Sequence, residues 1–216
     1  MIRKRIEKMP KTIKGLFCPG LPLSIIPKKW IALNKEISEE WANWKDVPWW
    51  YNERAVLSVF AGAVWKSGNH AFEEFVDQKR KVSLKSGRFS RKYQGRVDLY
   101  WTVDAHEFIA EAKQCWSGAS ALNSETTSRI TKSLSKACAD IRKSKPHKQR
   151  RLAIVFVVPY VRQTCQRYID DRVRHWVKKI NKIDCDARAW IFPAVARKIK
   201  WQKAYYPGVA VLVKEI

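Results

Sequence analysis

Two acidic residues and a lysine interrupt a pair of otherwise apolar segments near the middle of the chain. Segment 95–103 contains Asp98, and segment 107–114 contains Glu111 and Lys113. Both segments have the composition of strands, and the short turn at 104–106 predicts that they form a hairpin. Because side chains alternate between the faces of a strand, Glu111 and Lys113 are expected on the same face. Burying a carboxylate beside an ammonium is costly unless the two groups pair or bind an ion.

Asp98 adds a second carboxylate, on the neighbouring strand of the expected hairpin. Two carboxylates on adjacent strands, with a backbone carbonyl nearby, offer the oxygen ligands that a hard divalent cation requires. The pattern therefore predicts a site for such a cation between Asp98 and Glu111.

A further acid, Glu53, lies in a segment with helical periodicity that starts near Pro48. Apolar residues recur there at three- and four-residue spacing, at Val56, Leu57, Phe60 and Val64. Glu53 precedes Leu57 by four residues, so its side chain is expected on the inward face of the helix. The alternative is a solvated first-turn acid that the helix dipole favours.

The elements around these residues alternate in type, without an internal repeat. We expect another helical turn or two at 71–77, a basic hairpin or loop at 79–96, a helix over 123–143, a strand at 152–158, a helix over 164–182, and strands at 187–192 and 209–213. The run 152–158 is continuously apolar, which is typical of a strand covered on both faces. The order predicts an α/β fold, a three-layer α/β/α sandwich with a central mixed β-sheet.

Residues 1–46 differ in composition from residues 47–216, which we expect to form the main domain. Prolines at 10, 19, 22 and 27 predict an extended basic arm that adds affinity for a partner. A short helix is expected around Ile31–Trp44, with tryptophans that either anchor the arm to the core or stack on bases.

The charge predicts a polyanionic partner. Lysine and arginine number 43 against 20 aspartate and glutamate residues, for a formal net charge of +23. Nucleic acid is the expected counterpart, with an anionic membrane or ribosomal surface as alternatives. Contacts to phosphates are expected from three basic segments, through Lys85, Arg88, Arg91, Lys92, Arg96, Lys148, Arg150, Arg151, Lys198 and Lys200.

Other candidate residues carry weaker signals. The four histidines share no metal-ligand spacing, which argues against a zinc site. Glu73, Glu74 and Asp77 are expected on a solvated face. No apolar run is long enough to span a membrane, no signal peptide is evident, and the five scattered cysteines lack a CxxC pair. We therefore expect a cytoplasmic protein with free thiols.

The spaced trio resembles the motif of the PD-(D/E)xK nuclease superfamily, the fold of many restriction and repair endonucleases. The resemblance covers residues 48–158 and rests on Asp98, the sequence Glu111-Ala112-Lys113, the flanking apolar strands, Gly95 before the first acid and Gln114 after the lysine. The preceding helix with Glu53 is also a recurrent family feature. One departure is Val97, which stands where the family motif has proline.

The resemblance implies a restriction-endonuclease-like fold and a Mg²⁺ site, with Mn²⁺ as a substitute. Asp98, Glu111, the Ala112 carbonyl and Glu53 would hold the metal, Lys113 would stabilise charge on the phosphate or orient the attacking water, and Gln114 would orient the phosphate or a ligand.

The expected function is therefore hydrolysis of phosphodiester bonds in DNA, double-stranded in the first instance, by an endonuclease. The alternatives are a non-catalytic nucleic-acid-binding subunit of a defence, repair or mobile-element complex, and an RNA-directed nuclease. No separate module for reading base sequence is evident, so a homodimer or a partner protein would have to supply specificity.

Overall fold

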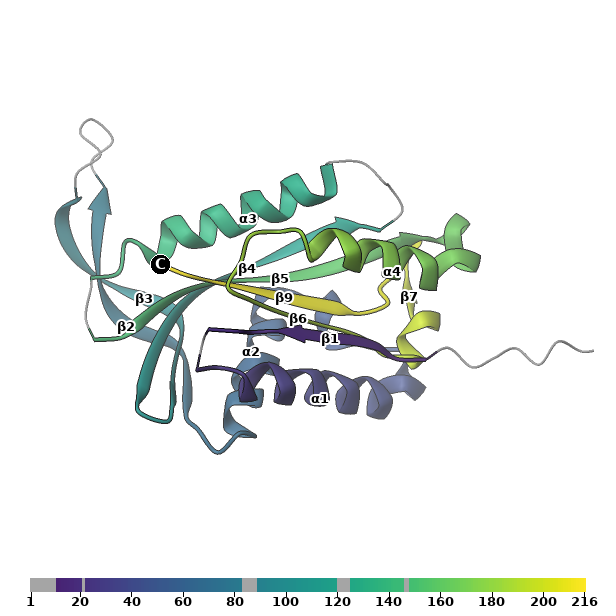
Figure 1. The fold of residues 1–216 in the computed structure, drawn as a ribbon, viewed down its shortest axis with the longest axis horizontal. Helices are drawn as coiled ribbons and strands as arrows, with labels where there is room; N and C mark the ends of the chain where they lie inside the picture. The colour runs from purple at the N-terminus through teal and green to yellow at the C-terminus, as the bar shows by residue number, and fades with distance from the viewer. Residues whose placement is uncertain (1–10, 21, 83–88, 120–124, 146–147) are drawn as a thin grey trace, which may run out of the picture.

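The protein folds around a mixed β-sheet of nine strands with helices on both faces (Figure 1). The computed structural model describes residues 11–20, 22–82, 89–119, 125–145 and 148–216. The strands are β1 (Ile13–Phe17), β2 (Ala71–Val82), β3 (Phe89–Val103), β4 (His106–Gly118), β5 (Arg150–Arg162), β6 (Ala187–Phe192), β7 (Lys200–Trp201), β8 (Ala204–Tyr205) and β9 (Val209–Glu215). The helices are α1 (Ile25–Glu40), α2 (Glu53–Trp65), α3 (Glu125–Ile141) and α4 (Ile169–Ile180).

The main path of the sheet runs β1-β6-β9-β5-β4-β3-β2, and β7 and β8 form a small hairpin on the end of β5. Strands β4 and β5 are parallel, and the other neighbours are antiparallel. Helix α3 makes the crossover that a parallel pair requires. The expected α/β class with a mixed central sheet is thus confirmed.

Two hydrophobic cores lie on the two faces of the sheet. Helices α1 and α2 cover one face, and α3 and α4 cover the other (Figure 1). Strand β5 contributes to both cores, because Ile154 and Phe156 point to the α1–α2 side and Val155 and Val157 to the α3–α4 side. Its continuous apolar run follows from this double burial, as the sequence predicted.

The structure corrects the description of residues 1–46 as an arm over residues 11–20 and 22–46, while residues 1–10 and 21 lie outside the described residues. Strand β1 pairs with β6, and α1 begins at Ile25, six residues before the expected start. Pro27 lies in the first turn of α1, where a missing N–H costs little because it would have no partner within the helix. Ile26 and Trp30 are almost fully buried in the α1–α2 core.

The expected helical turns at 71–77 are also wrong, because this segment belongs to β2. The β2–β3 ladder begins at Ala71–Trp101 and includes the partners Val82 and Phe89, so pairing with β3 outweighs the helical spacing of the apolar residues. The tip of the expected basic hairpin, residues 83–88, lies outside the described residues.

The five cysteines are all free thiols. Within the part of the chain that the structure describes, no helix is long and apolar enough to cross a membrane.

Candidate active site

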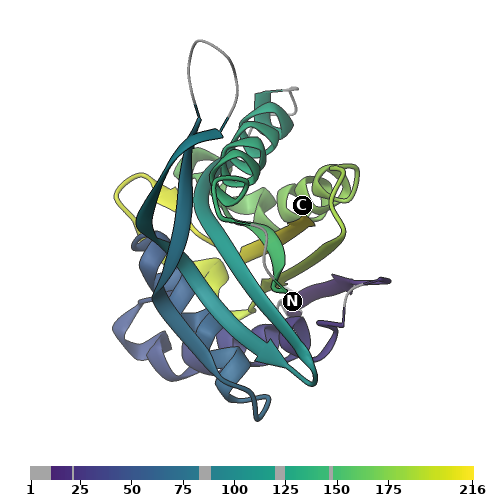
Figure 2. The same cartoon turned by 90° about the vertical axis from the view of Figure 1, so that its left-hand side faces the viewer.

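Strand β3 separates from β4 at Asp98. The ladder between the two strands runs from Val103–His106 to Leu99–Ala110 and ends there. Beyond this point the β2–β3 hairpin twists away from β4 towards α3 (Figure 2). The amide of Arg80 donates to the Lys143 carbonyl at 2.8 Å, which attaches β2 to the segment after α3. Past Ala110, β4 therefore presents an edge that β3 does not cover.

Two carboxylates occupy this edge in place of the missing strand. The Ala112 N–H donates to Asp98 Oδ2 at 2.7 Å, and the Gln114 N–H donates to Glu53 Oε2 at 2.9 Å. Residues two apart on a strand direct their N–H groups to the same side, so the two acids cap successive donors. An uncapped donor would be costly in this partly buried setting.

Helix α2 begins in a way that fixes Glu53. The expected start at Pro48 is instead a 3₁₀ turn, Pro48–Trp50, and the side chain of Asn52 caps α2 by accepting the Ala55 N–H at 3.0 Å. Glu53 is thus the first residue of the helix, and its carboxylate contacts β4. The expected inward orientation fits this contact better than the alternative of a fully solvated acid.

Glu111 is a buried carboxylate with a raised pKa. Its side chain is 6% exposed and forms an ion pair with Lys79 of β2. Burial raises the pKa of Glu111 to about 7, the Lys79 hydrogen bond opposes that rise, and the nearby charge of Asp98 adds to it. Glu111 therefore changes its charge near neutral pH.

Lys113 links the strand to α3. Its ammonium donates to the Ala112 carbonyl at 2.8 Å and lies 3.5 Å from Asp140 Oδ2. Asp140 also accepts a 2.6 Å hydrogen bond from Lys143. Although burial acts to raise it, the pKa of Asp140 lies below its ordinary value because these two lysines favour the charged form.

The donor atoms at the site suit a hard divalent cation. They are the carboxylates of Asp98 and Glu111 and the carbonyl of Ala112. Mg²⁺ in proteins is usually held by one or two carboxylates, with water and substrate phosphates supplying the rest. Among the described residues, no group of three or more His, Cys, Asp or Glu side chains could hold a metal. In the structure, ammonium groups of Lys79 and Lys113 contact Glu111 and the Ala112 carbonyl, so a metal ion would have to displace them.

The sequence-predicted residues Asp98, Glu111, Lys113, Glu53 and Gln114 all lie in this one cluster. The Gln114 amide differs from its expected role, because its Nε2 donates to the Trp49 carbonyl at 2.9 Å. This contact holds β4 to the turn before α2.

Sequence reasoning missed Lys79 as a member of the site and counted it only among the basic residues of 79–96. Lys79 reaches Glu111 past Gly95, where an added Cβ would lie 2.8 Å from Lys79 Cδ. The glycine thus leaves the space through which the lysine side chain passes. Gly95 is a sequence feature that points to Lys79, but it can be interpreted only when the register of β2 against β3 is known.

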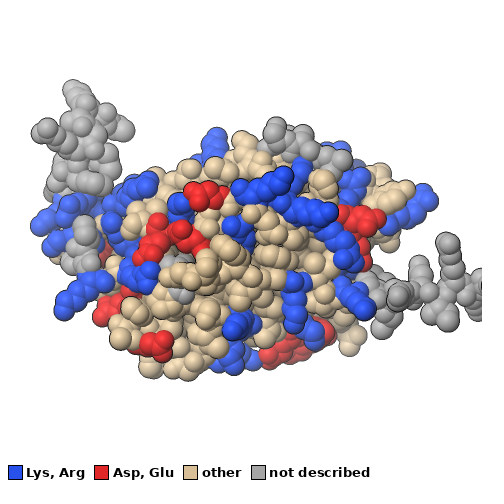
Figure 3. Space-filling model, viewed as in Figure 1, with Lys and Arg blue, Asp and Glu red and all other residues tan. Residues whose placement is uncertain are grey.

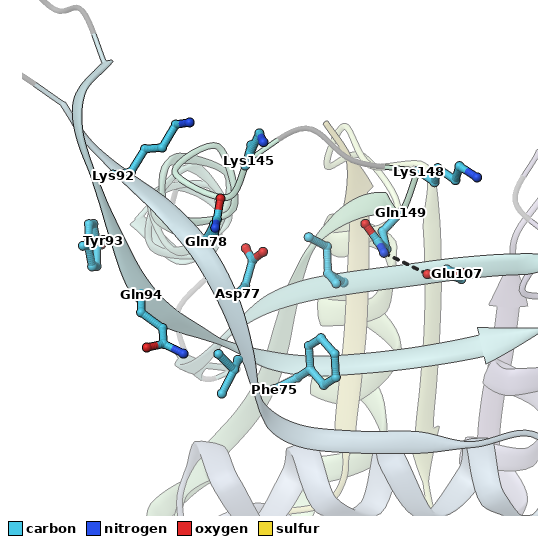
Figure 4. Close-up of a pocket in the computed structure, with 12 residues that line it drawn as sticks. Phe75, Asp77, Gln78, Lys92, Tyr93, Gln94, Glu107, Lys145, Lys148 and Gln149 are labelled. Atoms are coloured by element: carbon cyan, nitrogen blue, oxygen red, sulfur yellow. Dashed lines mark hydrogen bonds between the residues drawn. The ribbon is translucent and has the colours of Figure 1, made fainter.

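Some predicted nucleic-acid contacts surround an open cleft of about 1050 Å³ between the β2–β3 hairpin and the start of β4. Lys92 and Lys148 line this cleft together with Asp77 and Glu107, and Gln149 donates to Glu107 at 2.8 Å (Figure 4). Lysine and arginine side chains also spread over the α3–α4 side of the molecule (Figure 3).

The other residues predicted to contact nucleic acid differ in how far the structure leaves their charged groups exposed. Arg150 binds both carboxylate oxygens of Glu215, at 2.6 and 2.7 Å, and lies over the Phe108 ring, so it stabilises the fold instead of offering a free charge. Arg96 is exposed 3.7 Å from Glu74. Arg151 is half-buried, and Lys200 is exposed on β7. Lys85 and Arg88 lie outside the described residues, as do the side chains of Arg91 and Lys198.

Comparisons with protein-family models, with curated proteins and with solved structures found no match to this chain.

Proposed function

We propose that the protein is a metal-dependent nuclease with a restriction-endonuclease-like fold, which hydrolyses phosphodiester bonds of DNA with Mg²⁺, or Mn²⁺ in its place. The observation that carries the proposal is the convergence of Asp98, Glu111 and Lys113 where β3 separates from β4. Two carboxylates and a lysine at an open strand edge would provide a cation site and a positive charge beside it.

Each residue has a task in this reaction. Asp98 and Glu111 would hold the metal with the Ala112 carbonyl. The bound metal would polarise the scissile phosphate and activate water. Lys113, once released from the Ala112 carbonyl, would stabilise the negative charge that develops on the phosphate. Glu53 would hold the β4 edge in place through the Gln114 N–H.

The buried position of Glu111 supports the proposal. Glu111 is 6% exposed, and its pKa is raised to about 7 because burial outweighs the ion pair with Lys79. Acidic residues with such perturbed pKa values are often found at functional sites, where a bound ligand offsets the free-energy cost of burying them. A divalent cation between Asp98 and Glu111 would offset both the cost of burying Glu111 and the repulsion between the two carboxylates.

A second candidate function is a non-catalytic nucleic-acid-binding subunit. The observation that favours it is that lysine ammonium groups already satisfy Glu111 and the Ala112 carbonyl. In that case the cluster would be a structural ion-pair network, and its carboxylates would only cap β4.

Asp98→Asn separates the two candidates, because the amide keeps an oxygen for the Ala112 N–H and removes the charge. For a nuclease, Mg²⁺ should raise the melting temperature of the wild type and support cleavage. Asp98→Asn should melt like the wild type in EDTA and lose both metal-dependent effects. Asp98→Ala is the less specific variant, because the uncapped N–H alone should cost about 1–3 kcal/mol.

The assay should compare linear, circular and single-stranded DNA and RNA, each with Mg²⁺, Mn²⁺ or EDTA. Cleavage of RNA alone would assign the site to an RNA-directed enzyme. A wild type with neither metal-dependent cleavage nor metal-dependent stabilisation would refute the nuclease and favour the second candidate.

A further inference from the structure

A second cleft, of about 930 Å³, lies at the carboxyl ends of β4 and β5, away from the β2–β3 hairpin. Its main lining is aromatic and basic: Trp116, Tyr160, Trp201, Tyr206, Arg162 and Lys203. None of the lining residues that the structure describes is acidic. The cleft has no part in the reaction proposed above.

Three aromatic side chains form its floor on the α1–α2 side of the sheet. Trp116 and Tyr160 lie near the ends of the parallel strands β4 and β5, where Gly118 pairs with Tyr160. The ring of Tyr206 meets that of Trp116 edge to face, with centroids 5.3 Å apart. Tyr206 is only 9% exposed, so this floor is built before any ligand arrives.

The small hairpin of β7 and β8 places Trp201 at the side of the cleft. The ring of Trp201 lies 6.5 Å from that of Tyr206 and is tilted to it, yet Trp201 remains 51% exposed. Strand β8 pairs with the end of β5, and the Gln163 N–H donates to the Lys203 carbonyl at 3.0 Å. The hairpin thus holds an indole in place while half of its surface contacts water.

The cleft shares strand β4 with the candidate active site, although its floor lies on the α1–α2 side of the sheet and the Lys113 side chain reaches Asp140 of α3 on the other side. Trp116 follows Ala112 by four residues, or about 13 Å at the rise of a strand, which is the rise of about four stacked nucleotides. Trp49 joins the two places directly, because its carbonyl accepts from Gln114 and its indole N–H donates to the Tyr206 carbonyl at 3.0 Å.

We propose that this cleft binds an unpaired nucleobase of a DNA strand whose backbone crosses the candidate active site. Flat aromatic faces stack on any base, and Arg162 and Lys203 at the rim can contact the adjoining phosphates. The basic rim and the net charge of +23 favour a nucleic-acid strand over a peptide as the occupant. Only the placement of the strand at the scissile site rests on the proposed function. Base binding itself does not.

Trp201→Ala tests the proposal in EDTA, where no cleavage occurs. The variant should bind a fluorescein-labelled oligothymidylate about tenfold more weakly, the loss of one stacked base, as measured by fluorescence anisotropy. Binding of a blunt duplex and of heparin, a polyanion without bases, should change less than twofold. Trp201→Phe keeps a stacking face and should restore most of the affinity.

Trp65→Ala is the matched control. Trp65 is 50% exposed, like Trp201, but lies at the end of α2 far from Glu53. It should leave all three affinities unchanged. The proposal would be overturned by equal losses in the two tryptophan variants, by an equal loss on heparin, or by a wild type that does not bind the oligothymidylate. Intact base binding without any cleavage would instead refute only the nuclease.

Discussion

At the scale of single residues, two ammonium groups offset the electrostatic cost of holding two carboxylates close together in the site. Lys79 neutralises Glu111, and Lys113 lies between the Ala112 carbonyl and Asp140. Asp98 has a second task, because its carboxylate replaces a missing strand partner for Ala112. Variants that remove charge but keep hydrogen bonding are therefore needed to separate chemistry from structure.

The raised pKa of Glu111 predicts a pH dependence of stability. Between its ordinary value of 4.5 and its folded value of about 7, the folded protein keeps a proton that the unfolded chain has released. This group therefore lowers the free energy of unfolding as pH rises through that interval, by at most about 1.4 kcal/mol per pH unit. Denaturant unfolding between pH 5 and 8 should show a steeper loss for the wild type than for Glu111→Gln, which cannot titrate. Parallel profiles would contradict the assignment of the proton to Glu111.

The role of Lys113 can be tested by comparison with Lys143, because both lysines contact Asp140. In the proposed nuclease reaction, Lys113→Ala should leave Mg²⁺ affinity nearly intact and reduce the cleavage rate about 100-fold, because one stabiliser of the transition-state charge would be lost. Lys143→Ala is the control, since Lys143 also binds Asp140 but is not bonded to the Ala112 carbonyl. Single-turnover kinetics at saturating metal would measure both. Equal rates in the two variants would make Lys113 a structural residue.

At the scale of elements, the sequence predicted the hairpin and both strands of the site but not the way they separate. The spacing of Glu111 and Lys113 places both side chains on one face of β4, because the strand repeat is local. The separation of β3 from β4 depends on the attachment of β2 to the segment after α3, through Arg80 and Lys143. Such long-range contacts leave no periodic signal, which is why Lys79 was missed.

Deletion of residues 1–28 distinguishes an arm from a structural element. The deletion removes β1 and the start of α1, including the buried Ile26, and exposes the edge of β6. Loss of one large core side chain costs about 2–5 kcal/mol, and an uncovered edge favours aggregation. We expect a lower melting temperature and aggregation measured by light scattering. A truncated protein with unchanged melting that loses only DNA affinity would restore the interpretation as an arm.

At the scale of the whole molecule, the composition predicted the net charge more reliably than it predicted which individual cations are exposed to a partner. The net charge of +23 holds whichever residues carry it, whereas the availability of each cation depends on its tertiary partners. Arg150 illustrates the difference, because its ion pair with Glu215 could not be inferred from a sequence separation of 65 residues. Lys92 and Lys148, in contrast, are exposed at the cleft between the β2–β3 hairpin and the start of β4.

If the protein binds DNA as proposed, the salt dependence of that binding should reflect which cations are exposed. Each lysine that neutralises a phosphate contributes about one unit to the slope of log affinity against log salt. The double substitution Lys92→Met and Lys148→Met should therefore reduce the slope by about two. Lys66→Met, on the α1–α2 side where Lys66 pairs with Glu36, removes one charge away from the cleft and should leave the slope unchanged. Anisotropy titrations at several salt concentrations measure both, and equal slopes in all three proteins would remove the cleft from the path of the DNA.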